Sequence, residues 1–454
     1  MGNPHVLVIP FPAQGHVLPL MELSQCLVNH GIRVTFVNTQ ENHKRVMDAL
    51  VMKDGMGDQF HLVSIPLVQE SSENTGQLAE KLVEAILWLM PKKVEELIEQ
   101  INASDSDKIT CVLADPVLNW AMEIAAKKGI RRAVFYCAAA TQLVLRSRIQ
   151  KLIDDGIVDD DGIPKKEMFQ LSSTMPVMST AHIGFLWLGT SKMQRLFFEN
   201  TVKNNPSIQL AEWVLCNSTH DLEPAAFNTD PKFKQIGPLL ARNRFGDSAG
   251  SFWPEDLTCL KWLDQQPAQS VVYIAFGSTT IFDQTQFQEL AMGLELSNRP
   301  FLWVVRSDIA AKINDAYLKG LQDRIAPRGH IVSWAPQQKV LAHPSIACFI
   351  SHCGWNSTME GISNGVPFLC WPYFADQKHN ENYICNVWNV GLGFSKDESG
   401  IITREEIKSK LEELLDNGKY KGNALDLKES LMNNIKEGGC SYNNFKNFVE
   451  WLKT

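Results

Sequence analysis

Short apolar runs alternate with amphipathic stretches along most of the chain, and this pattern constrains the fold more than any other feature. The apolar runs occupy residues 5–10, 32–38, 109–114, 131–136, 211–216, 233–236, 270–276, 300–305, 330–333, 347–351 and 366–371. Between many of them apolar residues recur at helical spacing, for example over 17–29 and 118–128. Such alternation is typical of βαβ units, in which helices cover a parallel sheet. The sequence therefore predicts an α/β protein.

An irregular segment divides this pattern into two halves. It opens at Gly237-Pro238 and carries Arg, Asn, Gly, Asp and Ser with little periodicity, which is typical of a linker. The predicted parts are one α/β domain at 1–238, a linker at 239–254, a second α/β domain at 255–436 and a terminal helix within 437–454. Open α/β sheets bind ligands at the carboxyl ends of their strands, so facing domains would place the site in the cleft between them.

Two stretches of the first half depart from the simple alternation. Residues 77–101 are amphipathic throughout and are predicted as one long helix, bent at Pro91. Residues 155–206 are less regular, and their aromatic residues and methionines suit a lid or a pocket wall.

Composition excludes several classes of protein. Of the 454 residues 44% are apolar and 21% are charged, as in ordinary globular proteins, and the net charge of −8 disfavours nucleic acid as a partner. No continuous apolar run is long enough to predict a membrane span, and the first residues lack the basic region of a secretory signal. The ten cysteines include no CxxC pair, which favours free thiols in a reducing compartment. We expect a cytoplasmic monomer.

Common catalytic and cofactor motifs are missing from the sequence. It contains no GxxxxGK[ST] loop, no GxGxxG after a strand and no HExxH. Two acidic pairs, Asp105/Asp107 and Asp159/Asp161, lie in sequence rich in Ser, Gly and Asp, where solvated turns are expected. We therefore predict no metal site and no bound cofactor.

Residues 334–377 are unusually dense in Trp, Pro, Gly, His, Asn and acidic residues. The strand over 347–351 ends in the turn His352-Cys353-Gly354, after which a helix begins. The N–H groups at the start of that helix form a seat for an anion such as a diphosphate. Glu360, one turn further on, could accept two hydroxyls of a ribose, and Trp334 could present a flat face to a base.

This segment, WAPQQKVLAHPSIACFISHCGWNSTMEGISNGVPFLCWPYFADQ, resembles the plant secondary-product glycosyltransferase box and fills its 44 positions without a gap. The resemblance to plant-type UDP-dependent glycosyltransferases acting on small molecules extends over the whole chain, through FPAQGH near the start and Phe276-Gly277-Ser278. It implies a GT-B fold, in which two Rossmann-like domains face each other across a cleft. It also implies that the helix within 437–454 packs back on the first domain.

The resemblance implies a role for each matching position of the box. The residues implied are Trp334 and Ala335 for uracil, Gln337 and Glu360 for the ribose, Ser278, His352, Asn356 and Ser357 for the diphosphate, and Trp355, Asp376 and Gln377 for the sugar. A final Gln together with Trp at position 355 usually accompanies UDP-glucose in the family, so we expect glucose as the sugar. Taken singly, each of these residues is more often structural, and only the ordered set favours a donor site.

His16 and Asp115 each follow a predicted strand at its carboxyl end. Histidine can take a proton near neutral pH, and an adjacent aspartate could fix its tautomer and stabilise the imidazolium. Each residue alone is more often structural. In the resemblance, His16 matches the family's general base and Asp115 matches the carboxylate that orients that base. The resemblance therefore implies that the sugar is transferred with inversion at its anomeric carbon and that no metal ion is needed. Cys137 stands where the family often has Ser or Thr, and a buried cysteine is the favoured interpretation there.

The acceptor is less well specified. Candidate lining residues for its pocket are Trp120, Phe185, Trp187, Phe197 and Phe374, and an apolar aromatic pocket suits a flavonoid, another phenolic or a terpenoid. Three alternatives stay open: transfer to carbon of a phenolic ring, a non-catalytic UDP-sugar binding protein, and a nucleotide-dependent oxidoreductase. The missing GxGxxG motif disfavours the last of these.

Overall fold

The structure is a computed structural model that describes residues 4–50, 58–67, 75–104, 107–239, 252–280, 282–313, 320–321, 323–325 and 328–454. Its contacts divide the chain into two compact units. The first comprises Met1–Phe252, Phe374–Asp376 and Asn433–Thr454, and the second comprises Trp253–Tyr373 and Gln377–Met432. Most of the predicted linker, residues 240–251, lies outside the described residues.

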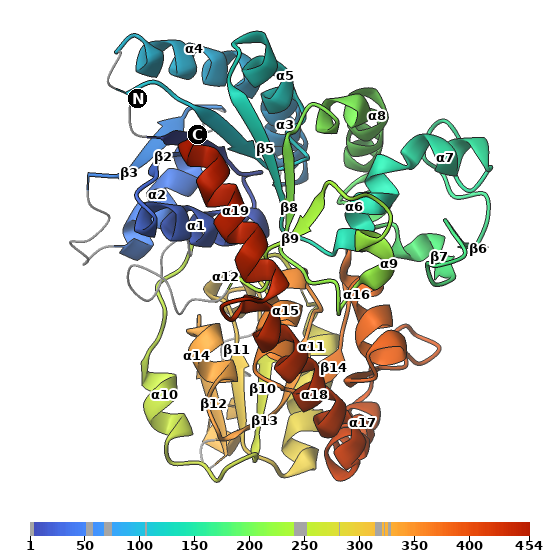
Figure 1. The fold of residues 1–454 in the computed structure, drawn as a ribbon. Helices are drawn as coiled ribbons and strands as arrows, with labels where there is room; N and C mark the ends of the chain where they lie inside the picture. Colours follow the sequence, from blue (N-terminus) through green and yellow to red (C-terminus); the bar gives the residue numbers. More distant parts are fainter. Residues whose placement is uncertain are drawn as a thin grey trace. The chain divides into compact units, whose positions relative to one another are not determined.

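The first unit is built on a parallel sheet with strand order β3-β2-β1-β4-β5-β8-β9 (Figure 1). The strands are β1 (His5–Ile9), β2 (Arg33–Thr39), β3 (Phe60–Ile65), β4 (Cys111–Ala114), β5 (Arg131–Tyr136), β8 (Trp213–Cys216) and β9 (Phe233–Gln235), and a small antiparallel pair consists of β6 (Met168–Phe169) and β7 (Met178–Ser179). The central strands β1 and β4 are buried along their whole length, which explains their nearly continuous apolar sequences.

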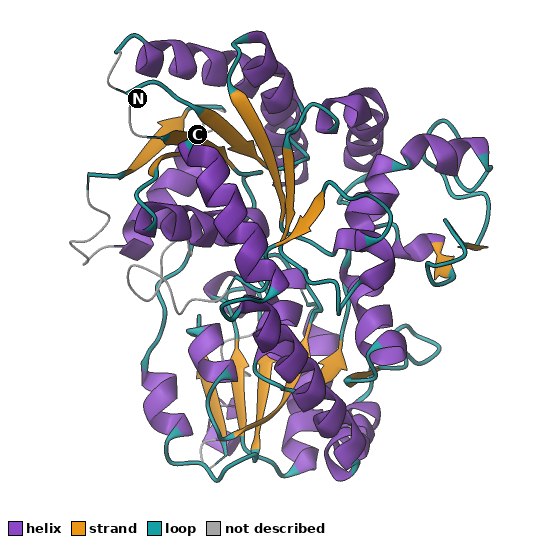
Figure 2. Ribbon diagram, viewed as in Figure 1, coloured by secondary structure: helices purple, strands orange, loops and turns teal. Residues whose placement is uncertain are grey.

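Helices flank this sheet, as the alternating pattern predicts (Figure 2). They are α1 (Gln14–Asn29), α2 (Gln40–Leu50), α3 (Thr75–Trp88), α4 (Met90–Asn102), α5 (Trp120–Lys127), α6 (Ala140–Ser147), α7 (Ile149–Asp154), α8 (Ser191–Ile208), α9 (Pro224–Phe227) and α19 (Cys440–Lys453), with the 3-10 turns η1 (Thr180–His182) and η2 (Gly184–Trp187). The end of α1 has a clear local cause, because Gly31 follows it with φ of 77°, a conformation that glycine adopts readily.

Two predictions for the first unit are wrong in detail. The single helix expected over 77–101 is two helices, α3 and α4, because the chain turns at Leu89 and Pro91 occupies the first turn of α4, where a proline is tolerated. The segment 155–206, expected to be irregular, contains the long helix α8. Its start is fixed by Thr190, whose hydroxyl accepts a hydrogen bond from the N–H of Met193 at 3.3 Å.

The C-terminal helix α19 belongs to the first unit. The Arg131 guanidinium lies 3.9 Å from the ring centre of Trp451, and Trp213 of β8 packs against Phe448 at 5.5 Å. The Asn444 side chain donates to the backbone carbonyl of Gln235 at 3.0 Å. Aromatic packing and polar contacts therefore hold α19 beside the strands β5, β8 and β9.

The second unit has a parallel sheet of order β12-β11-β10-β13-β14-β15. Its strands are β10 (Val271–Ala275), β11 (Phe301–Val304), β12 (Gly329–Val332), β13 (Ile346–Ser351), β14 (Phe368–Cys370) and β15 (Gly391–Gly393). Its helices are α10 (Thr258–Leu263), α11 (Gln284–Ser297), α12 (Ser307–Ala310), α14 (Gln337–Leu341), α15 (Trp355–Ser363), α16 (Gln377–Asn382), α17 (Arg404–Asp416) and α18 (Gly418–Ile435), with the π-helical turn η4 (Tyr383–Val387).

Both sheets reverse their strand order once, and the reversal marks a binding position. In the first unit β1 lies between β2 and β4, and in the second β10 lies between β11 and β13. Ligands of open α/β sheets bind beyond the carboxyl ends of the strands at such a switch point. The residues that follow β1, β4, β10 and β13 are therefore the candidates for contact with a ligand. None of the helices within the described ranges has the length and apolar character needed to cross a bilayer.

Candidate active site

The switch point of the first unit brings His16 and Asp115 together. His16 lies in the first turn of α1, just beyond β1, and Asp115 directly follows β4. His16 Nδ1 lies 2.5 Å from Asp115 Oδ2, and Asp115 Oδ1 accepts a hydrogen bond from the Val117 N–H at 2.8 Å. The Asp115 side chain is 1% exposed, whereas that of His16 is 30% exposed. The buried carboxylate thus fixes the ring and leaves Nε2 as the nitrogen that can accept a proton.

Opposing effects set the basicity of His16. Burial lowers the pKa of His16, but the neighbouring Cys137 and Asp115 raise it through charge and hydrogen bonding, and the net result lies well above its usual value. The imidazolium is therefore favoured at neutral pH, and the base form increases as the pH rises.

Cys137, the residue after β5, completes this cluster. Its Sγ lies 3.2 Å from His16 Nδ1 and 3.8 Å from Asp115 Oδ2, and its side chain is buried. Burial raises the pKa of the Cys137 thiol, the adjacent His16 lowers it, and the effect of burial is the larger. The sequence indicated a buried cysteine but gave no sign of these two contacts, because they depend on how β4 and β5 align.

The same three side chains offer a nitrogen, an oxygen and a sulfur within 4.8 Å of one another. Such a donor set fits a borderline-soft cation such as Zn²⁺, and in the described part of the chain it is the one cluster of this kind. Of the acidic pairs seen in the sequence, Asp159 Oδ1 accepts from the N–H groups of Asp161 and Ile163 at 3.1 and 2.8 Å, as in a simple turn. Asp105 lies outside the described residues.

An apolar cluster adjoins the His16 ring. Phe11 makes an edge-to-face contact with His16, with ring centres 5.3 Å apart, and a similar contact with Phe197 at 5.9 Å. Phe197 is buried and packs with Val83, Leu87 and Val117. Phe197 was predicted as an acceptor contact, and Phe11 lies between it and His16, touching both rings. Phe11 was not predicted as a site residue, although it lies just past the end of β1.

The other acceptor candidates occupy different environments. Trp120 and Phe185 are buried in the main core of the first unit. Trp187 is 40% exposed, and its Nε1 donates to the Thr180 carbonyl at 3.2 Å. Phe374 is grouped with the first unit and is partly buried. Of these four, Trp187 presents the most surface to a ligand.

In the second unit two glycines make room for His352 at the switch point. Gly277 follows β10 with φ of 68°, and a Cβ added to it or to Gly354 would lie 2.5 Å from His352 Nε2. Burial lowers the pKa of His352 to about 4, and the nearby charge of Arg306 acts in the same direction. His352 is therefore neutral near pH 7, and it can donate a hydrogen bond without carrying a charge.

Helix α15 begins directly after His352 and supplies an anion seat. Its N-cap is Gly354, which has no side chain to accept from the first-turn N–H groups. Asn356 and Ser357 lie in this first turn, and Ser278 follows Gly277 at the end of β10. The predicted diphosphate residues thus all stand at the switch point of this sheet.

The two residues predicted to bind ribose are hydrogen-bonded to each other. Gln337 Nε2 donates to Glu360 Oε2 at 2.6 Å and to Ser357 Oγ at 2.8 Å. Tyr273 donates to Gln337 Oε1 at 3.1 Å, and Gln338 Nε2 donates to Glu360 Oε1 at 3.0 Å. Glu360 is buried, so its carboxylate is held in place by amide donors. Tyr273 and Gln338 were missed because nothing in the sequence separates them from ordinary strand and helix residues.

The predicted uracil residues form a platform. Trp334 stacks on Trp253 with ring centres 4.7 Å apart, and its carbonyl accepts the N–H of Asp256 at 2.9 Å. Ala335 is buried beside it. Trp334 is itself only partly buried, so a base can reach it.

The predicted sugar residues are divided between the two units. Trp355 is buried and lies 6.3 Å from the Trp388 ring. Gln377 begins α16, and its Oε1 accepts the N–H of Tyr373 at 2.7 Å. Asp376 is grouped with the first unit, where a Cβ on Gly184 would lie 2.9 Å from the Asp376 backbone.

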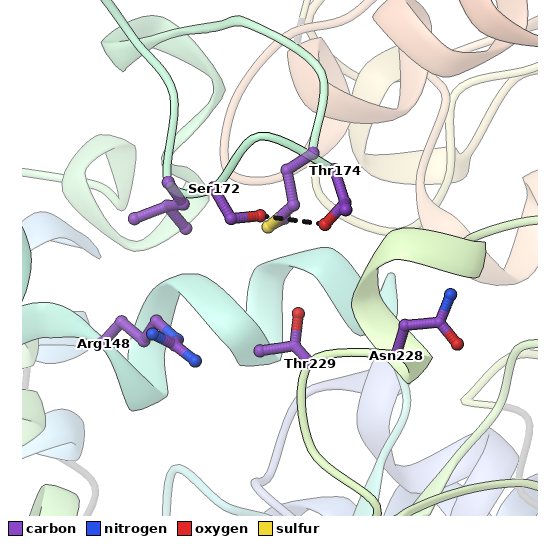
Figure 3. A pocket seen from close by; sticks show the side chains of 7 residues that line it. Arg148, Ser172, Thr174, Asn228 and Thr229 are labelled. Carbon is purple, nitrogen blue, oxygen red and sulfur yellow. Dashed lines mark hydrogen bonds between the residues drawn. The ribbon is translucent and has the colours of Figure 1, made fainter.

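One cavity of about 210 Å³ lies elsewhere in the first unit (Figure 3). Its lining residues are Arg148, Leu171, Ser172, Thr174, Met175, Asn228 and Thr229. It contains none of the predicted site residues, and Ser172 and Thr174 of its lining are hydrogen-bonded at 3.1 Å.

Fold and geometry together define a class of protein. One Rossmann-like unit carries a His–Asp pair suited to removing a proton, and the other carries a nucleotide-type site with a stacking platform, a carboxylate for hydroxyls and a helix N-terminus for phosphate. Such a pair of units suits an enzyme that uses a nucleotide-linked substrate.

Comparisons with known proteins define the family. The model of the family described as UDP-glucoronosyl and UDP-glucosyl transferase matches residues 33–433. The chain is 46% identical to UDP-glycosyltransferase 83A1 of Arabidopsis thaliana over 100% of this chain and 98% of that protein. The chain therefore belongs to this family and is a UDP-glycosyltransferase.

Solved structures of other proteins have the same fold as this chain. The structure of Os79 from O. sativa in complex with UDP has a TM-score of 0.80 at 29% identity and covers 98% of this chain and 100% of that chain. The structure of Phytolacca americana UGT2 with UDP-2fluoro-glucose and pterostilbene has a TM-score of 0.83 at 26% identity and covers 100% of both chains. The predicted GT-B fold class is thereby confirmed.

Proposed function

We propose that this chain transfers glucose from UDP-glucose to a hydroxyl of a lipophilic small molecule, with inversion at the anomeric carbon. The observation that carries the proposal is the contact of 2.5 Å between His16 and Asp115 at the switch point of a Rossmann-like sheet. A chain that only binds UDP-sugars would have no use for a base held by a buried carboxylate.

The proposed chemistry is a single displacement. The acceptor oxygen attacks the anomeric carbon while its proton passes to Nε2 of His16, and the bond from that carbon to the UDP oxygen breaks with its electron pair. Asp115 accepts from Nδ1–H and stabilises the imidazolium that forms. Attack opposite to the leaving group converts an α-linked donor into a β-glycoside.

The leaving diphosphate gains negative charge, and the second unit has groups to stabilise it. The proposed contacts are the N–H groups at the start of α15, the side chains of Asn356, Ser357 and Ser278, and a hydrogen bond from neutral His352. Trp334 and Ala335 would bind the uracil, and Gln337 with Glu360 the ribose. Every step uses groups of the chain itself, so we propose that no metal ion is required.

The proposal of glucose as the sugar and of a lipophilic acceptor rests on the side chains expected to contact each of them. Trp355, Asp376 and Gln377 are the proposed sugar contacts, and the apolar cluster of Phe11 and Phe197 beside His16 suits a flavonoid, another phenolic or a terpenoid. The Phytolacca structure, which contains a fluorinated UDP-glucose and pterostilbene, supports this choice. We further propose that the enzyme acts as a cytoplasmic monomer with the domain boundaries predicted from the sequence.

The test uses purified protein, UDP-glucose and a panel of phenolic and terpenoid acceptors, with and without EDTA. We expect a β-glucoside, detected by mass spectrometry and assigned by the NMR coupling of its anomeric proton, at equal rates in both conditions. UDP-galactose serves as the matched donor control and should react more slowly. A rate abolished by EDTA, an α-linked product or a carbon-linked product would each contradict the corresponding part of the proposal.

A further inference from the structure

The chain holds an alanine in a conformation that alanine rarely adopts, directly before Asp376. Ala375 has φ of 55°, in the left-handed region where the Cβ of an L-residue crowds its own backbone. Such a conformation persists only where the surrounding structure holds it, and it is frequent at functional sites. The residues that contact the 374–376 segment are therefore the ones that hold it in place.

The 374–376 segment lies against the turn η2, and both belong to the first unit. The Ala375 N–H donates to the Trp187 carbonyl at 3.4 Å. Gly184, which begins η2, is buried, and a Cβ added to it would lie 2.9 Å from both N and Cα of Asp376. These neighbours are backbone atoms, so no flexible side chain could turn aside. Only a glycine at position 184 lets the segment approach this closely.

The turn η2 is itself fixed by hydrogen bonds from two side chains. Gln142 of α6 is 2% exposed, and its amide donates to the His182 carbonyl at 2.6 Å and accepts from the Gly184 N–H at 3.0 Å. The indole Nε1 of Trp187 donates to the Thr180 carbonyl at 3.2 Å, which ties the end of η2 to η1. Gly184 thus stands on a rigid support.

This support determines where the Asp376 carboxylate lies. Asp376 is one of the proposed sugar contacts, and its side chain is partly exposed. A carboxylate recognises sugar hydroxyls by accepting hydrogen bonds, which weaken steeply when distance or angle departs from the optimum. The other proposed sugar contacts, Trp355 and Gln377, belong to the second unit. Among the three, η2 therefore acts on Asp376 alone.

We infer that Gly184 is a positioning residue for sugar recognition. Because it has no side chain, the Asp376 backbone can lie against η2, and the carboxylate is held where it accepts hydroxyls of the donor's sugar. The inference rests on the proposed function and adds to the donor site a residue far outside 334–377. The proposed contacts of uracil, ribose and diphosphate all belong to the second unit. Gly184 therefore acts on recognition of the sugar and not of the nucleotide.

The test compares UDP with UDP-glucose in Gly184→Ala. The Kd of UDP, measured by calorimetry, should stay within about twofold of wild type, because the nucleotide contacts are untouched. The KM for UDP-glucose should rise about tenfold with little change in kcat, as expected for a lost hydrogen bond to a charged group. Gly422→Ala of α18 is the matched control, since a Cβ there would have no neighbour within 4 Å, and it should change neither value.

Asp376→Ala separates positioning from a general effect of the substitution. Alone it should raise the KM for UDP-glucose by a similar factor. Adding Gly184→Ala should then raise the KM no further, because the carboxylate that Gly184 positions is already gone.

Ala375→Val perturbs the segment without adding an atom at the buried Gly184. A β-branched residue is strongly disfavoured at φ of 55°, so the segment should leave its position. This variant too should raise the KM for UDP-glucose and leave the Kd of UDP unchanged. Melting temperatures report folding, and Ala375→Val decides the question if Gly184→Ala does not fold.

Three results would overturn the inference. The first is a KM for UDP-glucose within about twofold of wild type in the folded variants Gly184→Ala and Ala375→Val. The second is a Kd of UDP that rises as much as the KM. The third is additivity of Gly184→Ala and Asp376→Ala. A wild-type protein that does not convert UDP-glucose at all would instead refute the proposed function, so the two failures are distinguishable.

Discussion

Replacing Asp115 with Asn tests how the catalytic pair works. The two side chains have nearly the same shape, and the amide oxygen can keep the 2.8 Å contact with the Val117 N–H. The charge opposite His16 Nδ1, however, is lost. The variant therefore removes the electrostatic partner and leaves the packing of a 1% exposed side chain almost unchanged.

The expected loss in kcat is about 10²–10⁴, the usual contribution of a positioned general base, or about 3–5 kcal/mol of transition-state stabilisation. The pH profile should move as well. The base form of His16 is the active one, so activity rises as the pH passes the His16 pKa, which lies above its usual value in the wild type. Without the carboxylate, one of the two groups that raise the His16 pKa is lost, so that pKa falls and the rising limb should shift to lower pH.

The assay is the initial rate of glucoside formation from about pH 5 to about pH 10 at saturating UDP-glucose, with the melting temperature as a check of folding. Asp159→Asn is the matched control, since the Asp159 carboxylate supports a turn of the first unit and pairs with Lys165 at 2.8 Å. A pH–activity profile of Asp115→Asn whose rising limb coincides with that of wild type would refute the assigned role of Asp115. So would a kcat within twofold of wild type.

Three further predictions concern the donor site and the cluster at His16. Gly277→Ala should abolish UDP binding measured by calorimetry, because its Cβ meets His352; Gly400→Ala, with a similar positive φ but open space, should leave binding intact. Glu360→Gln should raise the KM for UDP-glucose about tenfold with little change in kcat, since a charged acceptor of ribose hydroxyls becomes neutral; an unchanged KM would count against that contact. Added Zn²⁺ should inhibit the wild type through the nitrogen, oxygen and sulfur cluster, and Cys137→Ala should be inhibited much less; equal inhibition would mean that the ion acts elsewhere.

The sequence predicts the sites that depend on strand ends. His16 follows β1, Asp115 follows β4 and His352 follows β13, so a strand assignment together with the switch-point rule already places them. Glu360 was found in the same way, because one helical turn separates it from the start of α15. These features are local in sequence or follow from parallel pairing of adjacent strands.

What the sequence does not reveal depends on side chains that meet from distant segments. The contact of Phe11 with Phe197 and the contact of Cys137 with His16 arise from packing between elements more than a hundred residues apart. Helix α8 was missed because its polar residues obscure the apolar face and its start depends on a cap at Thr190.

The most direct test of the account separates donor binding from chemistry in one variant. His16→Ala is compared with wild type for the Kd of UDP-glucose by calorimetry and for kcat with a phenolic acceptor. His30→Ala, just beyond the end of the same helix α1, serves as the control. We expect a Kd within about twofold of wild type and a kcat reduced by about 100-fold or more. A His16→Ala protein that still turns over at the wild-type rate would contradict the central claim, as would one that no longer binds UDP-glucose.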